Sequence, residues 1–270
     1  RFRTLLIPYL FWSSFVILFY YILQSIPQFM PFFTNELIKD YSVNKLLITL
    51  FVNPIPYQLW FLRNLIVFVI VSPLFFILAR YGKVYSLIIA LILWYFEVMV
   101  WFITSESIFF FLIGSYLGVK KNDLDTTRFA KKYYLWILLI VWLILTVLKT
   151  LLSVYEFNSI AINALQKFNI LLGICTVWLL YDKFFYNVDI SKSHLLHICT
   201  YTFFFYLTHE PVLTILKKVL FVFWGSSMVS FISIYFIAPV ITICFCILTG
   251  EVLRKLTPKI YYIISGGRWI

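Results

Sequence analysis

Long apolar runs dominate this chain and restrict its fold more than any other feature. Several of them reach the length of about 20 residues that an α-helix needs to cross the hydrocarbon core of a bilayer. Hydrophobic residues make up 63% of the 270 positions and charged residues only 12%, whereas soluble proteins are about 45–50% apolar and about 25% charged. This composition argues against a soluble globular domain and predicts an integral membrane protein.

The apolar runs predict a polytopic, all-α bundle of about eight transmembrane helices. They lie at about 5–23, 57–79, 84–103, 106–119, 133–152, 168–186, 198–222 and 229–249. A helix satisfies its own backbone hydrogen bonds in lipid, and the alternating pattern of a transmembrane barrel is not found in the sequence. The fourth run is short and is also compatible with a half-span. No repeat or linker divides the chain, so residues 1–270 are interpreted as a single membrane domain.

The distribution of Lys and Arg predicts the orientation in the membrane. If the N-terminus lies in the cytoplasm, fifteen of the 22 basic residues fall on the cytoplasmic side, six fall on the opposite side and Arg63 lies within a span. An excess of Lys and Arg in cytoplasmic loops is typical of membrane proteins. Both ends of the chain are therefore expected in the cytoplasm, and the net charge of +11 needs no nucleic-acid partner.

Five ionisable residues lie inside or at the rim of the apolar runs: Arg63, Glu97, Glu106, His209 and Glu210. A charge in hydrocarbon costs on the order of 2.5–3.5 kcal/mol on insertion scales, so residues of this kind usually have a function. Arg63 and Glu97 are expected at similar depths in two helices joined by a turn near Tyr81, and we predict that they pair or share a polar cavity. The alternatives are an ion pair that only locks the two helices together, and two side chains that reach the headgroups separately.

The sequence His209-Glu210-Pro211 lies near the middle of the predicted span 198–222. Proline removes a backbone donor and opens the preceding helical turn. A histidine beside an opened turn has a side-chain pKa near neutrality and backbone groups to bond. One interpretation of His209 is a proton-handling or substrate-binding residue, and the other is a packed histidine that bonds across helices.

Five motifs in order resemble the acyltransferase 3 family, a family of integral membrane, mostly bacterial enzymes. They are Arg-Phe-Arg-Thr-Leu-Leu-Ile-Pro-Tyr-Leu-Phe-Trp-Ser at 1–13, Leu-Trp-Phe-Leu-Arg at 59–63, Phe-Phe-Leu-Ile-Gly-Ser-Tyr-Leu-Gly at 110–118, Phe-Tyr-Leu-Thr-His-Glu-Pro at 205–211, and Pro258 followed by Gly-Gly-Arg at 266–268. The resemblance implies about ten helices in the full-length family. It also places the family's leading catalytic histidine on a helix upstream of Arg1, so the chain is interpreted as N-terminally truncated, and its activity as it stands is an open question.

The resemblance also implies a reaction at the cell membrane, in bacteria the inner membrane. An acyl group, typically acetyl, moves from cytoplasmic acetyl-CoA or another acyl-CoA to a hydroxyl of a cell-surface polysaccharide or lipid-linked sugar, that is, an O-acetylation. No other cofactor and no metal site are expected, because the four cysteines lie in or beside apolar runs without a metal-binding spacing. Membrane lipid, acyl-CoA and the glycan acceptor are the expected partners.

Roles for individual residues complete the sequence-based hypothesis. His209, Glu210, Arg63 and Glu97 are the candidate catalytic residues, Arg1 and Arg3 are candidates for binding coenzyme A phosphates, and Trp60 and Glu106 are candidates for the acceptor. The basic residues also fit the positive-inside rule alone, and tryptophans also fit an interfacial aromatic belt. The alternative functions are a transporter or flippase for a lipid-linked saccharide, and a non-catalytic scaffold in polysaccharide assembly.

Overall fold

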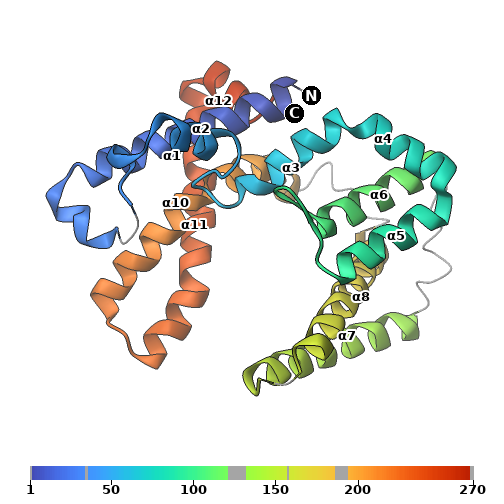
Figure 1. Ribbon diagram of the computed structural model, residues 1–270. Helices are drawn as coiled ribbons and strands as arrows, with labels where there is room; N and C mark the ends of the chain where they lie inside the picture. Colours follow the sequence, from blue (N-terminus) through green and yellow to red (C-terminus); the bar gives the residue numbers. More distant parts are fainter. Residues whose placement is uncertain (1, 34–35, 121–131, 157, 186–193, 268–270) are drawn as a thin grey trace. The chain divides into compact units, whose positions relative to one another are not determined.

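The computed structural model describes residues 2–33, 36–120, 132–156, 158–185 and 194–267 (Figure 1). Nearly all of these residues are helical, which confirms the predicted all-α class. The chain forms two compact units. The first comprises Arg1–Ser72 together with His194–Ile270, and the second comprises Pro73–Ser193. Each unit is described by itself, and the prediction of a single domain stays a prediction.

The first unit brings the two ends of the chain together. Its elements are η1 (Phe2–Leu6), α1 (Ile7–Gln24), η2 (Pro27–Phe32), η3 (Ile38–Asp40), α2 (Val43–Phe51), α3 (Leu59–Ile70), α9 (His194–Cys199), α10 (Thr202–Trp224), α11 (Met228–Leu256) and α12 (Pro258–Ile264). Helices α10 and α11 form an antiparallel pair, drawn in orange in Figure 1. Helix α1 packs against α2, α3, α10 and α12, and therefore lies at the centre of this unit's contacts.

The core of the first unit is rich in aromatic side chains. Its buried residues come from both ends of the chain: Leu5, Tyr9, Trp12, Leu59, Leu62, Tyr201, Phe204, Leu207, Tyr261 and Ile264. The Trp12 indole N–H donates to the Ile264 carbonyl at 3.1 Å. A Cβ at Gly266, whose φ is +72°, would lie 2.6 Å from the Thr4 carbonyl oxygen. Glycine is required there both by the positive φ and by this close approach.

The second unit consists mainly of two helical hairpins. Its elements are α4 (Ser72–Ile77), η4 (Leu78–Gly82), α5 (Lys83–Tyr95), β1 (Met99–Val100), β2 (Ile103–Thr104), α6 (Ser105–Lys120), α7 (Lys132–Val154) and α8 (Ser159–Phe185). The two short strands pair antiparallel, with Met99 opposite Thr104, and connect α5 to α6. Helices α7 and α8 pack side by side as the second hairpin.

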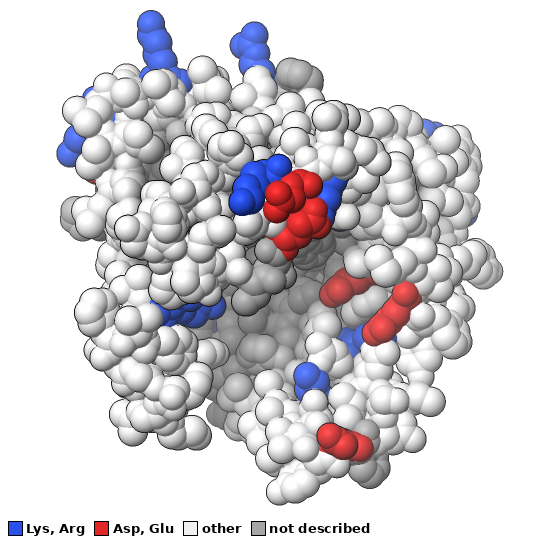
Figure 2. Space-filling model, turned by 60° about the vertical axis from the view of Figure 1, so that its left-hand side comes forward, with Lys and Arg blue, Asp and Glu red and all other residues white. Residues whose placement is uncertain are grey.

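Five helical stretches among the described residues are long and apolar enough to cross a membrane. They are Arg3–Gln24, Ser72–Tyr95, Tyr134–Val154, Ser159–Phe185 and Met228–Leu256, and Leu59–Ile70 is a shorter apolar helix. Large apolar side chains are widely exposed on these helices, and none of the residues 136–154 of α7 is buried. Figure 2 shows that charged side chains occupy only small patches of the face it presents. These features support a multi-pass membrane protein.

Three predicted spans differ from the observed helices. The run at 57–79 is not one helix, because α3 ends at Ile70 and α4 begins at Ser72. The run at 84–103 is helical only as far as Tyr95, because Glu97 and Trp101 adopt positive φ angles of 54° and 59° and the chain enters the β1–β2 hairpin. The run at 168–186 begins nine residues earlier than predicted, because α8 starts at Ser159. The predicted turn near Tyr81 is present, since Lys83 leaves the helical region with a φ of 47° and a ψ of −132°.

Candidate functional site

The most irregular point inside a long helix of the first unit is the kink of α10 at Glu210-Pro211. Glu210 has a φ of −103° and a ψ of 133°, and the peptide bond to Pro211 is cis. Pro211 has no N–H to donate to the carbonyl of Leu207, four residues earlier in the helix. The kink therefore leaves a backbone acceptor that another group must satisfy.

Gln58, which precedes α3, supplies that group. Its Nε2 lies 3.5 Å from the carbonyl oxygens of both Leu207 and Glu210. In return, the Tyr206 hydroxyl donates to the Gln58 carbonyl at 2.5 Å. The Gln58 side chain is buried, and its Oε1 has no hydrogen-bond partner within the part of the chain that the structure describes. Hydrogen bonds of Gln58 thus link the start of α3 to the kink of α10. The Gln58 Oε1 receives no donor from the described residues.

His209 lies one turn after Phe205 and is half-buried. Its Nδ1 is 2.9 Å from the Tyr206 carbonyl oxygen and 3.2 Å from that of Phe205. Both oxygens are acceptors only, so Nδ1 must carry the proton and Nε2 must hold the lone pair in the neutral ring. The imidazole also stacks on the Phe205 ring, with centroids 5.3 Å apart and an interplanar angle of 26°. His209 is therefore held in the tautomer that leaves Nε2 available as a base.

Glu210 is buried, with 7% of its surface exposed. Tyr20 of α1 lies within electrostatic range of its carboxylate. The structure thus brings His209 and Glu210 together at the kink of α10, as their adjacency in sequence requires, and places α1 and the start of α3 beside them.

Arg63 lies on α3 and is 9% exposed. Its Nη1 donates to the Val52 carbonyl, just beyond the end of α2, while Nε and Nη2 donate to Asn64 Oδ1 at 3.2 Å and 3.0 Å. The last carbonyls of a helix lack intrahelical donors and carry partial negative charge. The guanidinium therefore acts as a cap for the C-terminal end of α2.

The neighbouring carbonyls of α2 are satisfied in the same way. The Tyr9 hydroxyl donates to the Phe51 carbonyl at 3.1 Å, and the Ser13 hydroxyl donates to the Leu50 carbonyl at 3.2 Å. Both donors come from α1. Three side chains from two helices thus hold the end of α2, a helix that the sequence did not predict because it lies in the polar stretch between two apolar runs.

Glu97 lies in the second unit and forms a salt bridge with Lys167 of α8, with the Lys167 Nζ 3.0 Å from Glu97 Oε1. Lys167 also donates to the Tyr95 carbonyl at 3.0 Å and to Asn163 Oδ1. Hydrogen bonds from Lys167 and Asn163, together with the charge of Lys167, hold the pKa of Glu97 below its ordinary value. Arg63 and Glu97 belong to different units, so their predicted pairing stays a prediction.

The remaining candidate residues are dispersed over the chain. Trp60 is 42% exposed on α3, with its ring edge-on to that of Phe61. Glu106 is exposed in the first turn of α6, and Arg3 is exposed in η1. Arg1 lies outside the described residues. Of the sequence candidates, Arg3, Trp60, Arg63, His209 and Glu210 belong to the first unit, whereas Glu97 and Glu106 belong to the second.

A polar cluster at the start of α10 and the end of α11 was not predicted. Glu251 accepts from the Tyr201 hydroxyl, forms a salt bridge with Lys255 at 3.1 Å and lies 3.7 Å from His197 Nε2. Arg254 donates to the Tyr201 hydroxyl at 3.2 Å. From the sequence alone, Arg254 and Lys255 were expected only to orient the chain in the membrane, because Tyr201, which bonds to Arg254, lies 53 positions away.

A comparison with protein families decides the identity of the chain. The model of the acyltransferase domain called acyltransferase 3 matches residues 1–251. The chain belongs to the acyltransferase 3 family. No curated protein and no solved structure matches it. Every candidate residue named above except Arg254 and Lys255 falls within the matched range. Together, the family match and the long apolar helices make the protein a membrane acyltransferase that has acyl and acceptor substrates.

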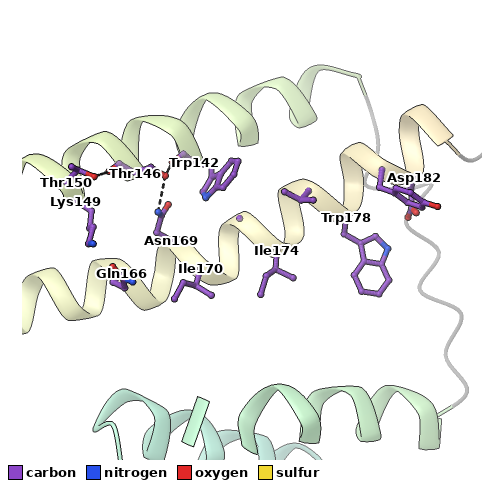
Figure 3. A pocket seen from close by; sticks show the side chains of 13 residues that line it. Trp142, Thr146, Lys149, Thr150, Gln166, Asn169, Ile170, Ile174, Trp178 and Asp182 are labelled. Carbon is purple, nitrogen blue, oxygen red and sulfur yellow. Dashed lines mark hydrogen bonds between the residues drawn. The ribbon is translucent and has the colours of Figure 1, made fainter. Parts of the chain in front are cut away.

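This acyltransferase also has a groove along its α7–α8 hairpin, shown in Figure 3, with a volume of about 960 Å³. Its lining combines polar, charged and aromatic side chains with aliphatic ones: Trp142, Thr146, Lys149, Thr150, Gln166, Asn169, Ile170, Gly173, Ile174, Val177, Trp178, Tyr181 and Asp182. None of these residues was a candidate from the sequence, and all of them except Gln166 lie in the predicted apolar runs 133–152 and 168–186.

Proposed function

We propose that this acyltransferase moves an acyl group, typically acetyl, from acyl-coenzyme A to a hydroxyl of a cell-surface glycan or lipid-linked sugar. The observation that supports this proposal best is the contact between His209 Nδ1 and the Tyr206 carbonyl oxygen at 2.9 Å. A hydrogen bond from Nδ1 to a backbone carbonyl leaves Nε2 free to take the proton of a hydroxyl, as a general base does in acyl transfer.

In the proposed reaction, Nε2 of His209 takes the acceptor's hydroxyl proton while the hydroxyl oxygen attacks the thioester carbonyl. The new ester C–O bond forms, the C–S bond breaks, and the thiolate leaves with the proton that His209 returns. The imidazolium that exists between these steps carries a positive charge, and we assign the buried carboxylate of Glu210 to stabilising it. No further co-reactant is needed.

The acceptor hydroxyl also needs to be oriented for attack. Gln58 has a buried Oε1 without a partner in the described part of the chain, next to the carbonyls of the kink. Movement of the side chains around the kink would let an acceptor hydroxyl reach this oxygen, and the hydroxyl would then lie beside α10. Trp60, exposed two residues later, supplies an aromatic face of the kind that stacks on a sugar ring.

The other candidates complete the proposal. Arg3 is exposed and able to bind coenzyme A phosphates as a bidentate donor, and we assign the same role to Arg1. Glu106 is exposed at the start of α6 and is assigned to the acceptor. For Arg63 and Glu97, the observed contacts favour positioning roles, since each is bonded to neighbouring protein groups.

Transfer of a radioactive acetyl group from acetyl-CoA to membrane glycans tests the proposal. The full-length protein is compared with His209→Ala, and with His197→Ala as a matched control outside the kink. General base catalysis contributes about 100- to 10,000-fold, so we expect His209→Ala to lose at least about 100-fold in kcat and His197→Ala to retain the wild-type rate. Absence of labelled product from the wild type would favour the transporter or scaffold functions, and full activity of His209→Ala would remove His209 as the base.

A further inference from the structure

The first unit contains a cavity between the C-terminal half of α1, η2 and the part of α10 that follows the kink. Its volume is about 350 Å³, which lies within the range of about 300–1,000 Å³ that is usual for small-molecule pockets. The aromatic rings of Phe19, Phe29 and Phe32 line it from α1 and η2, and the aliphatic side chains of Ile215 and Val219 line it from α10. The cavity is therefore largely apolar.

The cavity begins beside the kink of α10. Pro211, Ile215 and Val219 follow one another at intervals of four residues, and residues at this spacing lie on one face of a helix. Ile215 and Val219 line the cavity, so its α10 wall starts about one turn, or about 5.4 Å, beyond Pro211. Tyr20 of α1 also lines the cavity and lies within electrostatic range of Glu210. A group that reacts at the kink could thus extend directly into this cavity.

The charges around the cavity exclude an ionised occupant. Among the described residues that line it, Lys218 is the one with a charge, and its Nζ donates to the Phe32 carbonyl at 2.8 Å. This carbonyl ends η2, where helical carbonyls lack intrahelical donors. A carboxylate or a sugar would lose its hydration in the cavity without gaining enough partners to replace it. The lining therefore suits an uncharged hydrocarbon group.

Burial and size indicate the shape of this group. Phe19 and Thr214 are half-buried at the end next to the kink, whereas Val222 and Phe223 are 67% and 79% exposed at the other end. From Thr214 to Phe223 the cavity follows nine residues of α10, or about 14 Å at 1.5 Å per residue. At roughly 30 Å³ for a water-sized group, its volume corresponds to about a dozen CH₂ groups. An acetyl group would leave nearly all of this space empty.

We propose that this cavity holds the acyl chain of the donor, and that it makes the enzyme select straight acyl groups of roughly 8–12 carbons over acetyl. The thioester carbonyl lies beside His209, and the chain runs from Thr214 towards Val222. Arg3, to which the proposed function assigns the coenzyme A phosphates, directly precedes α1 and so lies at the opposite end of that helix. This inference rests on the proposed function, because it names the acyl group that is transferred; the bonds that form and break are the same as for acetyl.

A series of acyl donors tests this selectivity. The full-length protein in lipid nanodiscs transfers radioactive acetyl, butyryl, octanoyl, decanoyl or palmitoyl groups from coenzyme A to membrane glycans, and kcat/KM is measured for each donor. One methylene in a hydrophobic pocket changes kcat/KM by roughly 10–200-fold, so we expect decanoyl-CoA to exceed acetyl-CoA at least tenfold.

A matched pair of variants locates the selectivity in the cavity. Thr214→Trp fills the end beside the kink and should lower the ratio of decanoyl to acetyl transfer at least tenfold. Ile22→Trp places the same side chain at an exposed position of α1 outside the cavity and should leave this ratio at its wild-type value. Leu23→Trp, which also narrows the cavity, replaces Thr214→Trp if that variant does not fold.

Photo-crosslinking measures binding without transfer. A decanoyl-CoA that carries a diazirine at the end of its chain is irradiated with the full-length protein in the absence of glycan, and labelled peptides are identified by mass spectrometry. We expect labels within 19–23 and 214–223, reduced at least tenfold by Thr214→Trp and unchanged by Ile22→Trp. Equal labelling of these segments by a diazirine-bearing phosphatidylglycerol would overturn the inference, because the cavity would then hold bulk lipid.

Two further results would overturn it: acetyl-CoA used as well as decanoyl-CoA, or a ratio of decanoyl to acetyl transfer that the cavity variants leave unchanged. The failure of the proposed function is a different result. If the cavity is labelled as expected but no acyl group of any length reaches a glycan, the proposed function fails and the binding of the acyl chain stands. If acetyl is transferred through His209 without any preference for longer chains, the inference fails and the function stands.

Discussion

Arg63 shows how backbone and amide dipoles help to hold an ionisable residue in an apolar run. Its guanidinium donates to a helix-end carbonyl and to the Asn64 amide oxygen, so these dipoles contribute to stabilising its charge. The requirement for buried partners was predictable from the sequence. Their identity was not, because α2 lies in a stretch whose composition resembles a loop.

Replacing Arg63 with Leu should lower the thermal stability of the protein. The Val52 carbonyl would lose its donor, and an unsatisfied buried carbonyl costs about 1–3 kcal/mol. The midpoint of unfolding in detergent, followed by tryptophan fluorescence, should fall for Arg63→Leu and change little for Arg80→Leu, which is exposed. Equal midpoints for Arg63→Leu and wild type would show that Arg63 has no capping role.

Glu97 should make stability sensitive to acid. Its pKa in the folded protein lies below the ordinary value of 4.5, so the salt bridge contributes fully above that value and is lost as the pH falls through the lowered pKa. The effect is small because the side chain is 65% exposed. The unfolding midpoint of Glu97→Gln should therefore fall less between pH 7 and about pH 3 than that of the wild type. If the unfolding midpoints of both proteins fell equally over this pH range, the Glu97–Lys167 salt bridge would not contribute to stability.

The sequence did not identify Lys167 as the partner of Glu97. Lys167 was assigned to a loop before a span at 168–186, whereas α8 begins at Ser159 and carries Lys167 inside the helix. Apolar runs locate the lipid-facing middle of a helix, but not the polar turns that extend it beyond the hydrocarbon. The all-α class and the position of the α10 kink follow from apolar length and from Pro211, whereas tertiary partners depend on where helices begin and end.

At the scale of elements, the link between α3 and α10 is the feature that positions His209. Gln58 replaces the N–H that Pro211 lacks, and Tyr206 returns a hydrogen bond to the Gln58 backbone. Neither residue was predicted, although a glutamine directly before an apolar run and a tyrosine three residues before a buried histidine are visible in the sequence.

A double-mutant cycle tests this link. Gln58→Leu should reduce the free energy of unfolding, since the Leu207 carbonyl would lose its donor at about 1–3 kcal/mol. In a Pro211→Ala background an N–H becomes available to that carbonyl, so the same substitution should cost less. The coupling is measured from unfolding midpoints of the four proteins. Additive effects within about 0.5 kcal/mol would show that Gln58 and Pro211 act independently.

At the scale of the whole molecule, the two ends of the chain form one core. Helix α12 lies beyond the 1–251 range of the family match, yet Tyr261 and Ile264 are buried with Tyr9 and Trp12. The glycines that follow α12 explain the Gly-Gly-Arg motif in part, since Gly266 is in contact with the backbone of η1.

Gly266→Ala should destabilise the protein more than Gly225→Ala does. Both glycines have a φ near +71°, so both substitutions incur the penalty of a left-handed conformation. Only at Gly266 would the added Cβ also meet a backbone atom, the Thr4 carbonyl oxygen at 2.6 Å. The difference between the unfolding midpoints of the two variants measures the cost of the contact between the added Cβ and the Thr4 carbonyl. Equal decreases of the midpoint would show that this contact does not affect stability.

The hydrogen bond from Trp12 to the Ile264 carbonyl also has a consequence for biosynthesis. Its partners are 252 positions apart, and at a translation rate of about 5–20 residues per second α1 leaves the ribosome roughly 13–50 s before α12 exists. During that interval the Trp12 indole N–H does not yet have the Ile264 carbonyl as its acceptor. Nascent chains stalled before Pro258 should therefore be cut by proteases near Trp12 more readily than chains that include α12.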